Sequence, residues 1–199
     1  MSANHAAFNL IFRFVENYIS PIAGRISSQR HVMAIRDGFI SAMPFMIVGS
    51  FLLVFAYPPF SPDTTWGFAR AWLDLAKEFE GRILTPFDMT MGIMSIYICA
   101  AISYNLGKHY EKSNQLDPFM CAMLSIMAFL LIAAPKTNGT LPVDSLGGTG
   151  IFTAILVAIY CVEMMRFLKA HNIGIRLPDQ VPPMIKNSFD LLIPVLVVV

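Results

Sequence analysis

The sequence predicts an all-α polytopic membrane protein, with four complete transmembrane helices, a truncated fifth and amphipathic interfacial helices. The first observation is compositional: only 14% of the 199 residues are charged and 56% are hydrophobic, whereas soluble domains contain about 25% charged residues. The second is that apolar runs of about 20 residues, the length that crosses a bilayer, recur along the chain. The third is that residues 191–199 are apolar throughout. Together these observations indicate that lipid is part of the solvent.

Residues 1–37 form the first predicted unit, a cytoplasmic amphipathic segment. Apolar residues recur there at helical spacing, with polar residues on the opposite stripe. The pattern suits a helix on the cytoplasmic face or a contact between copies of the chain, and the sequence does not separate the two. The apolar stripe consists of Phe8, Ile11, Phe12, Val15 and Ile19. The first long apolar run begins near Gly38, too late for a cleavable signal peptide.

Four apolar runs then have the length of a membrane span. Pro44, in the first run, lacks a backbone donor and is expected to kink that helix. The runs cover residues 38–57, 84–107, 116–134 and 150–168.

Between the first two runs, residues 66–82 predict an amphipathic helix. Trp72, Leu75 and Phe79 recur at three- and four-residue spacing, and both tryptophans of the chain, Trp66 and Trp72, lie in this stretch. An interfacial helix on the outer membrane surface fits this pattern. The alternative is an ordinary loop helix that packs on its own protein.

A fifth apolar run begins near Phe189 and provides only half a span before Val199. A free carboxylate after Val199 would then lie in hydrocarbon, at a high free-energy cost. We therefore expect a truncated chain. The alternative is a C-terminus shielded by neighbouring helices.

The positions of lysine and arginine predict a cytoplasmic N-terminus, because cytoplasmic loops are enriched in these residues. The side predicted to face the cytoplasm carries Arg13, Arg25, Arg30, Arg36, Lys108, Lys112, Arg166, Lys169, Arg176 and Lys186, and the opposite side carries Arg70, Lys77, Arg82 and Lys136.

Polar residues inside the runs are the candidate site residues. Ser95 and Ser103 belong to a four-residue repeat of small residues in the second run. This repeat predicts either a substrate path lined by hydroxyls or, more simply, close helix packing. Glu163 in the fourth run lies three residues before Arg166, close enough to pair on one helix face. A paired carboxylate near the interface is the simpler interpretation of Glu163, and a role in transport is the alternative.

No catalytic residue, metal site or cofactor site is predicted. Cys99, Cys121 and Cys161 all fall within apolar runs and are interpreted as reduced packing residues. The formal net charge of +1, without a basic stripe, predicts no nucleic-acid partner.

Two longer stretches resemble a known family. They are "IRDGFISAMPFMIVGSFLLV" at residues 35–54 and "LPDQVPPMIKNSFDLLIPVLVV" at residues 177–198. Both are similar to the lactose/cellobiose/chitobiose type of IIC permease from the bacterial phosphotransferase system, and the resemblance extends along essentially the whole chain.

This resemblance implies that residues 38–199 are the N-terminal, dimer-forming scaffold half of a IIC membrane domain in the bacterial cytoplasmic membrane. It also implies import of a β-linked disaccharide, phosphorylation by a phosphorylated IIB partner that IIA supplies, and a homodimer in membrane lipid. Family residues that contact the sugar would lie beyond Val199. A truncated product that does not transport, or a small scaffold that associates with an intact permease, is the alternative.

Overall fold

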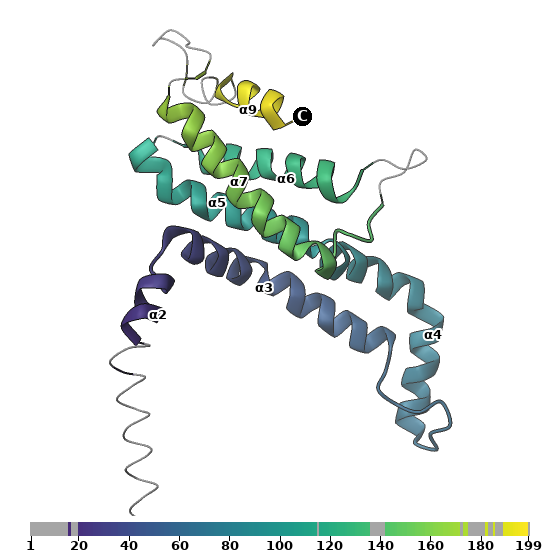
Figure 1. Ribbon diagram of the computed structural model, residues 1–199. Helices are drawn as coiled ribbons and strands as arrows, with labels where there is room; N and C mark the ends of the chain where they lie inside the picture. The colour runs from purple at the N-terminus through teal and green to yellow at the C-terminus, as the bar shows by residue number, and fades with distance from the viewer. Residues whose placement is uncertain are drawn as a thin grey trace, which may run out of the picture.

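The computed structural model describes residues 16, 20–114, 116–135, 142–171, 173–174, 182, 185 and 189–198, and these residues form helices and loops without a strand. The predicted all-α class is therefore confirmed for this part of the chain, while the predicted apolar stripe between Phe8 and Ile19 lies outside it. The elements (Figure 1) are α2 (Ser20–Ser27), α3 (Arg30–Ala56), α4 (Gly67–Phe87), the π-helix η2 (Asp88–Gly92), α5 (Met94–Asn114), α6 (Pro118–Ala133), the 3₁₀-helix η3 (Gly148–Gly150), α7 (Ile151–Ala170) and α9 (Leu192–Val198).

Helix α5 is the centre of the structure. It packs against α3 on one side and against α6 and α7 on the other, as Figure 1 shows. Ile98, Ile102 and Leu106 of α5 are completely buried, as are Phe129 of α6 and Val162 of α7. The core is therefore built around one helix that three others contact.

Two glycines bring helix backbones unusually close to α5. A Cβ atom built on Gly38 of α3 would lie 2.9 Å from the backbone nitrogen of Ile102. A Cβ atom built on Gly107 of α5 would lie 3.0 Å from the Cα atom of Pro118 at the start of α6. Lipid offers little hydrophobic driving force between helices, so van der Waals packing through small residues has to hold them together.

Three helical stretches are long and apolar enough to cross a membrane: Arg30–Ala56, Gly67–Ser113 and Gly148–Ala170. Helix α6 is apolar but has only 16 residues, a length of about 24 Å, against a hydrocarbon core about 30 Å thick. The prediction of four complete spans is therefore not confirmed. The fifth run contributes the helix α9, seven residues long, whose Pro194 is buried.

The second predicted run, residues 84–107, does not form a single helix. Residues 84–87 complete α4, and η2 separates them from α5. Pro86 lies in the last turn of α4 and has no backbone N–H to donate, which weakens the regular hydrogen-bond ladder at this point. The chain widens into a π turn, where the Thr90 hydroxyl donates to the carbonyl oxygens of Pro86 at 2.8 Å and Phe87 at 3.0 Å. The hydropathy of the sequence does not predict this change from α-helical to π-helical hydrogen bonding.

Helix α3, in contrast, continues without a break through Pro44. Pro44 therefore does not end the helix, and the kink expected there stays a prediction.

Helix α4 packs on the end of α3. The indole Nε1 of Trp72 donates to the Phe55 carbonyl oxygen at 3.3 Å, and the two rings lie 5.7 Å apart. The Tyr57 hydroxyl donates to Glu80 Oε1 at 3.1 Å. These contacts match the interpretation of α4 as a helix packed on its own protein. Its placement at the membrane surface stays a prediction.

We predict opposite effects for the same substitution at two helical glycines. Gly38→Ala should lower the unfolding midpoint, because the new Cβ meets the Ile102 backbone. Overpacking of this kind costs about 1–3 kcal/mol, more than the ~1 kcal/mol that alanine gains in helix propensity. The matched control is Gly81→Ala in α4, where a Cβ would meet nothing within 4 Å, and it should be neutral or stabilising. Thermal unfolding in detergent measures both variants, and a stable Gly38→Ala protein would contradict the close α3–α5 contact.

Candidate functional site

A polar cluster joins α3, α5 and α7 at one end of the bundle, and its central acceptor is the carboxylate of Glu163 on α7. Glu163 Oε1 accepts a hydrogen bond from the Tyr110 hydroxyl of α5 at 2.7 Å and lies 2.9 Å from His31 Nε2 of α3. Glu163 Oε2 accepts a hydrogen bond from Arg166 Nη1 at 2.8 Å. One carboxylate therefore links three helices.

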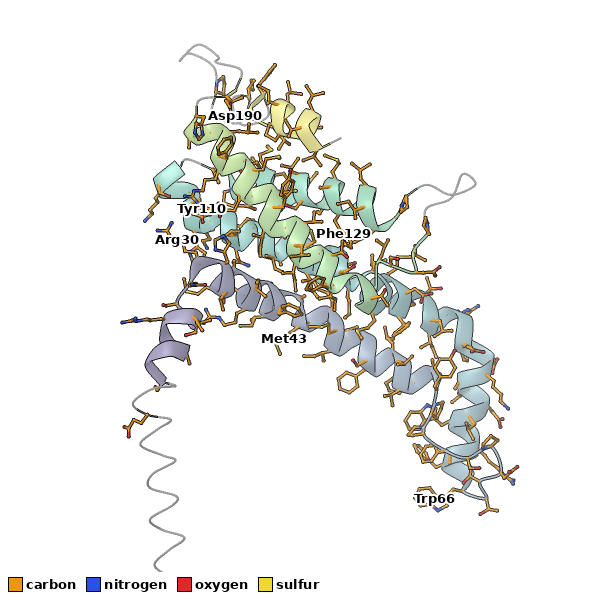
Figure 2. The ribbon with its side chains drawn as sticks, viewed as in Figure 1. Arg30, Met43, Trp66, Tyr110, Phe129 and Asp190 are labelled. Atoms are coloured by element: carbon orange, nitrogen blue, oxygen red, sulfur yellow. The ribbon has the colours of Figure 1, made fainter. Side chains whose placement is uncertain are left out.

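Two guanidinium groups approach the Tyr110 ring. The Cζ atom of Arg166 lies 4.7 Å from the ring centroid, and that of Arg30 lies 5.5 Å away. Arg166 Nη1 also donates to the Tyr110 hydroxyl at 3.3 Å. Figure 2 shows Arg30 and Tyr110 at the same end of the bundle, far from Trp66. Cation–π contacts of this kind contribute about 0.5–1 kcal/mol where they are exposed and more where they are desolvated.

The cluster is partly open to its surroundings. The Glu163 side chain is 32% exposed, and those of His31 and Arg166 are each 42% exposed. Glu163 lies seven residues before Ala170, the last residue of α7, which places it about 10 Å from the helix end. The predicted pair of Glu163 and Arg166 is confirmed, and a role for Glu163 in transport stays a prediction.

Sequence reasoning missed two members of the cluster, His31 and Tyr110. His31 lies 132 positions before Glu163, and Tyr110 lies 53 positions before it. Both residues are at the polar margins of apolar runs, where histidine and tyrosine are common at membrane interfaces. Both residues contact Glu163 only because the ends of three helices meet in space, and the sequence pattern does not show that meeting.

The other two candidate residues, Ser95 and Ser103, are completely buried in helix contacts. The Ser95 hydroxyl donates to the Leu146 carbonyl oxygen in the loop before α7. The Ser103 hydroxyl donates to the Cys99 carbonyl oxygen, one turn earlier, at 2.7 Å. A Cβ atom on Gly150 would lie 2.9 Å from Ser95 Oγ, so the start of α7 packs directly against this part of α5. The geometry favours helix packing, and the substrate path stays a prediction.

The cysteine thiols Cys99, Cys121 and Cys161 are free and buried. Cys99 Sγ donates to the Ser125 carbonyl oxygen at 3.5 Å across the α5–α6 contact. Within the described part of the chain, no three histidine, cysteine, aspartate or glutamate side chains gather in a way that could hold a metal ion.

An apolar hollow of about 630 Å³ lies where α4 meets the end of α3. Its walls are apolar and aromatic side chains, with the Arg82 guanidinium as the charged group. A sugar needs several converging hydrogen-bond partners, so this hollow does not suit one. The lining residues include Phe55, Phe68, Trp72, Leu75, Phe79 and Arg82.

Comparison with known proteins places these features in a family. Residues 36–199 match the family model described as "Phosphotransferase system, EIIC". The chain is 35% identical to the cellobiose-specific EIIC component of Geobacillus stearothermophilus, over 94% of this chain and 43% of that protein. It is 33% identical to the lactose-specific EIICB component of Streptococcus mutans, over 87% of this chain and 30% of that protein.

A solved structure agrees with these similarities. The crystal structure of the transporter ChbC, the IIC component of the N,N'-diacetylchitobiose-specific phosphotransferase system, superposes with a TM-score of 0.75 at 34% identity. The match covers 94% of this chain and 44% of that one. The chain thus spans less than half the length of these relatives.

The cluster predicts that Tyr110→Phe destabilises the bundle. The Tyr110 ring is buried, and removal of its hydroxyl takes a donor from the charged Glu163 carboxylate, which should cost about 1–2 kcal/mol. Tyr160→Phe is the matched control, because the Tyr160 ring on α7 is 58% exposed and should tolerate the change. Thermal unfolding in detergent compares the two, and equal midpoints would show that the cluster does not hold α5 to α7.

Proposed function

Because the chain belongs to the phosphotransferase system EIIC family, we propose that it forms the membrane scaffold of a permease that imports a β-linked disaccharide. Members of this family are integral membrane proteins, and the apolar helices described above agree with that setting. The observation that carries the proposal is the similarity to both a cellobiose-specific and a chitobiose-specific IIC component over 94% of the chain.

The names of the relatives support the sugar class. The three relatives are named as specific for cellobiose, N,N'-diacetylchitobiose and lactose. All three sugars consist of two pyranose rings joined by a β-linkage. We therefore assign a disaccharide of this class as the cargo of the complete permease, and we assign the sugar-contacting residues to a part of that permease outside residues 1–199.

The proposed partners are a phosphorylated IIB component and the IIA component that supplies it. The EIICB name of the Streptococcus mutans relative joins a IIC part to a IIB part. Phosphoryl transfer needs an exposed nucleophile, and the cysteines of this chain are completely buried. This burial disfavours the cysteines as phosphoryl carriers, and we propose that the IIB partner carries the phosphoryl group.

Two structural features suit a scaffold. The close contact of α3 with α5 and the hydrogen bonds of Glu163 hold the helices as one body, which a rigid-body, alternating-access motion requires. Helix α3 also presents a broad exposed apolar face, where a second copy of the chain or lipid would pack, and we propose a homodimer. That face includes Ile40, Met43, Ile47, Phe51 and Val54.

A chimera tests the function. Residues 1–199 should replace the matching segment of the Geobacillus stearothermophilus cellobiose component and retain phosphoenolpyruvate-dependent uptake of labelled cellobiose when IIA and IIB are present. The same chimera with Gly38→Leu, which forces α3 away from α5, is the inactive control. A chimera that inserts at normal levels but takes up no sugar would refute the scaffold role.

We also propose a cytoplasmic N-terminus. The bonds of Glu163 bring together the start of α3, the end of α5 and the end of α7, so their basic residues lie at one end of the bundle. By the positive-inside rule, this concentration of basic residues favours a cytoplasmic position for that end. These residues include Arg30, Arg36, Lys108, Lys112, Arg166 and Lys169.

Cysteine labelling tests this orientation without removal of the native thiols, because these are completely buried. Asp63→Cys, in the loop before α4, should react with a membrane-impermeant maleimide on intact cells. Lys112→Cys, at the end of α5, should react only after the cells are permeabilised. The reverse pattern would show that the chain is inserted the other way.

A further inference from the structure

A second hollow, of about 410 Å³, opens at the surface where α5 turns into α6. We call it the α5–α6 pocket. Its walls come from one face of α5 and from the first residues of α6, and they combine aromatic rings with charges of both signs. The residues that matter here are Tyr104, Lys108 and Glu111 of α5 together with Asp117 and Phe119.

Two charged residues of α5 line the pocket. Lys108 and Glu111 are both exposed, and neither forms an ion pair or a hydrogen bond in the described part of the chain. Other charged side chains on this end of the bundle do form ion pairs, such as Arg36 with Asp37 and Arg166 with Glu163. The pocket therefore offers one cation and one anion to a ligand from outside.

The acidic side of the pocket is reinforced by Asp117. Its Oδ1 accepts hydrogen bonds from the backbone N–H groups of Phe119 at 2.9 Å and Met120 at 3.2 Å, which caps α6. These bonds hold the carboxylate in place at the pocket wall. Glu111 and Asp117 thus create a negative region next to the positive charge of Lys108.

The order of these groups along α5 is set by the helix geometry. Tyr104, Lys108 and Glu111 are spaced by four and three residues, so they lie on one face of the helix. Lys108 is about 6 Å further along the axis than Tyr104, and Glu111 is about 4.5 Å beyond Lys108. The sequence after Gly107 is polar, so this direction leads out of the hydrocarbon. From the membrane outwards, the pocket presents aromatic, positive and then negative groups.

A zwitterionic phospholipid carries the complementary sequence of acyl chain, phosphate anion and amine cation in the same outward order. We propose that the α5–α6 pocket binds the headgroup of phosphatidylethanolamine. Lys108 binds the phosphate, Glu111 binds the primary ammonium beside Asp117, and the exposed rings of Tyr104 and Phe119 pack against the upper acyl chains. Tyr104 is 44% exposed and Phe119 is 59% exposed, which leaves both rings accessible to lipid.

The charges select among lipids. Phosphatidylglycerol has no cation for Glu111, and its net negative charge meets two carboxylates. Phosphatidylcholine carries a cation but no N–H group, so it cannot make the charge-assisted hydrogen bonds that an ammonium makes to a carboxylate. The inference requires only that the chain lies in a membrane. It does not depend on the identity of the sugar or on the direction of insertion.

Native mass spectrometry of the full chain tests the proposal. The purified protein in detergent receives equimolar phosphatidylethanolamine, phosphatidylcholine and phosphatidylglycerol with the same acyl chains, and the retained lipid is counted. The wild-type protein should retain phosphatidylethanolamine about tenfold more than either competitor, the effect of roughly one charge-assisted hydrogen bond.

A charge swap supplies the decisive variant. Lys108→Glu with Glu111→Lys keeps the composition but reverses the order of charges, and it should abolish the preference. The matched control is Asp74→Lys with Lys77→Glu on α4, two exposed residues outside the pocket with the same three-residue spacing, and it should keep the preference. All four positions are exposed, and circular dichroism checks that the variants remain helical.

Two results would overturn the proposal: equal retention of the three lipids by the wild-type protein, or an unchanged preference in the α5 swap. If the swap fails to fold, the single variants Lys108→Gln and Glu111→Gln replace it. Each should reduce retained phosphatidylethanolamine about three- to tenfold. If both single variants keep the wild-type preference for phosphatidylethanolamine, the site is refuted. Occupation of the pocket by a second copy of the chain would appear as dimers without lipid selectivity, which also refutes it.

Discussion

Close packing of small residues around α5 is the constraint on which the rest of the structure depends. Gly38 brings α3 against the backbone of Ile102, Gly107 admits the start of α6, and Gly150 lets α7 begin beside Ser95. Helices in lipid gain little from hydrophobic association, and dispersion forces fade within an ångström of extra separation. A side chain at any one of these positions would separate helices that meet on the same central element.

The Glu163 cluster adds directional hydrogen bonds to the apolar packing of the helices. Apolar contacts are non-directional, so they leave the rotation of α3 and α7 about α5 weakly specified. The hydrogen bond from Tyr110 on α5 and the contact with His31 on α3 both reach Glu163 on α7, so they favour one rotational setting of the three helices. Because these side chains are partly exposed at one end of the bundle, the charge is stabilised without the full cost of burial in hydrocarbon. The cluster therefore joins the three helices at one end, which is what the proposed scaffold role requires.

The outer surface of the protein is also divided into apolar and polar regions. Large apolar side chains such as Met43 of α3 and Leu156 of α7 are exposed along the helices, where a soluble protein would carry charge. Aromatic residues collect where α4 meets the end of α3, beside the charged face of α4. A second group of charged residues lies at the other end of the bundle, around Arg30 and Glu163. The α5–α6 pocket lies on that charged end, where headgroup chemistry and helix charges meet.

Much of this protein follows from local properties of its sequence. Low charge and long apolar runs were enough to predict a helical membrane protein, and the three-residue spacing of Glu163 and Arg166 was enough to predict their ion pair. The resemblance of residues 35–54 and 177–198 to IIC permeases likewise indicated the family that the comparisons confirm. Composition, periodicity and motifs are all contained in short segments, so no tertiary information was required.

Tertiary structure decided the features that join distant segments. His31 and Tyr110 reach Glu163 only because three helix ends meet, and the spacing of these residues along the chain contains no trace of that meeting. The end of α4 at Phe87 and the π turn after it depend on Pro86 and on packing against α3, whereas hydropathy had merged them with α5. The partners of Ser95 and Ser103 were equally out of reach, because a hydroxyl in an apolar run looks the same whether it faces a substrate or a backbone carbonyl. Contact energies depend on distance in space, and a sequence pattern records only distance along the chain.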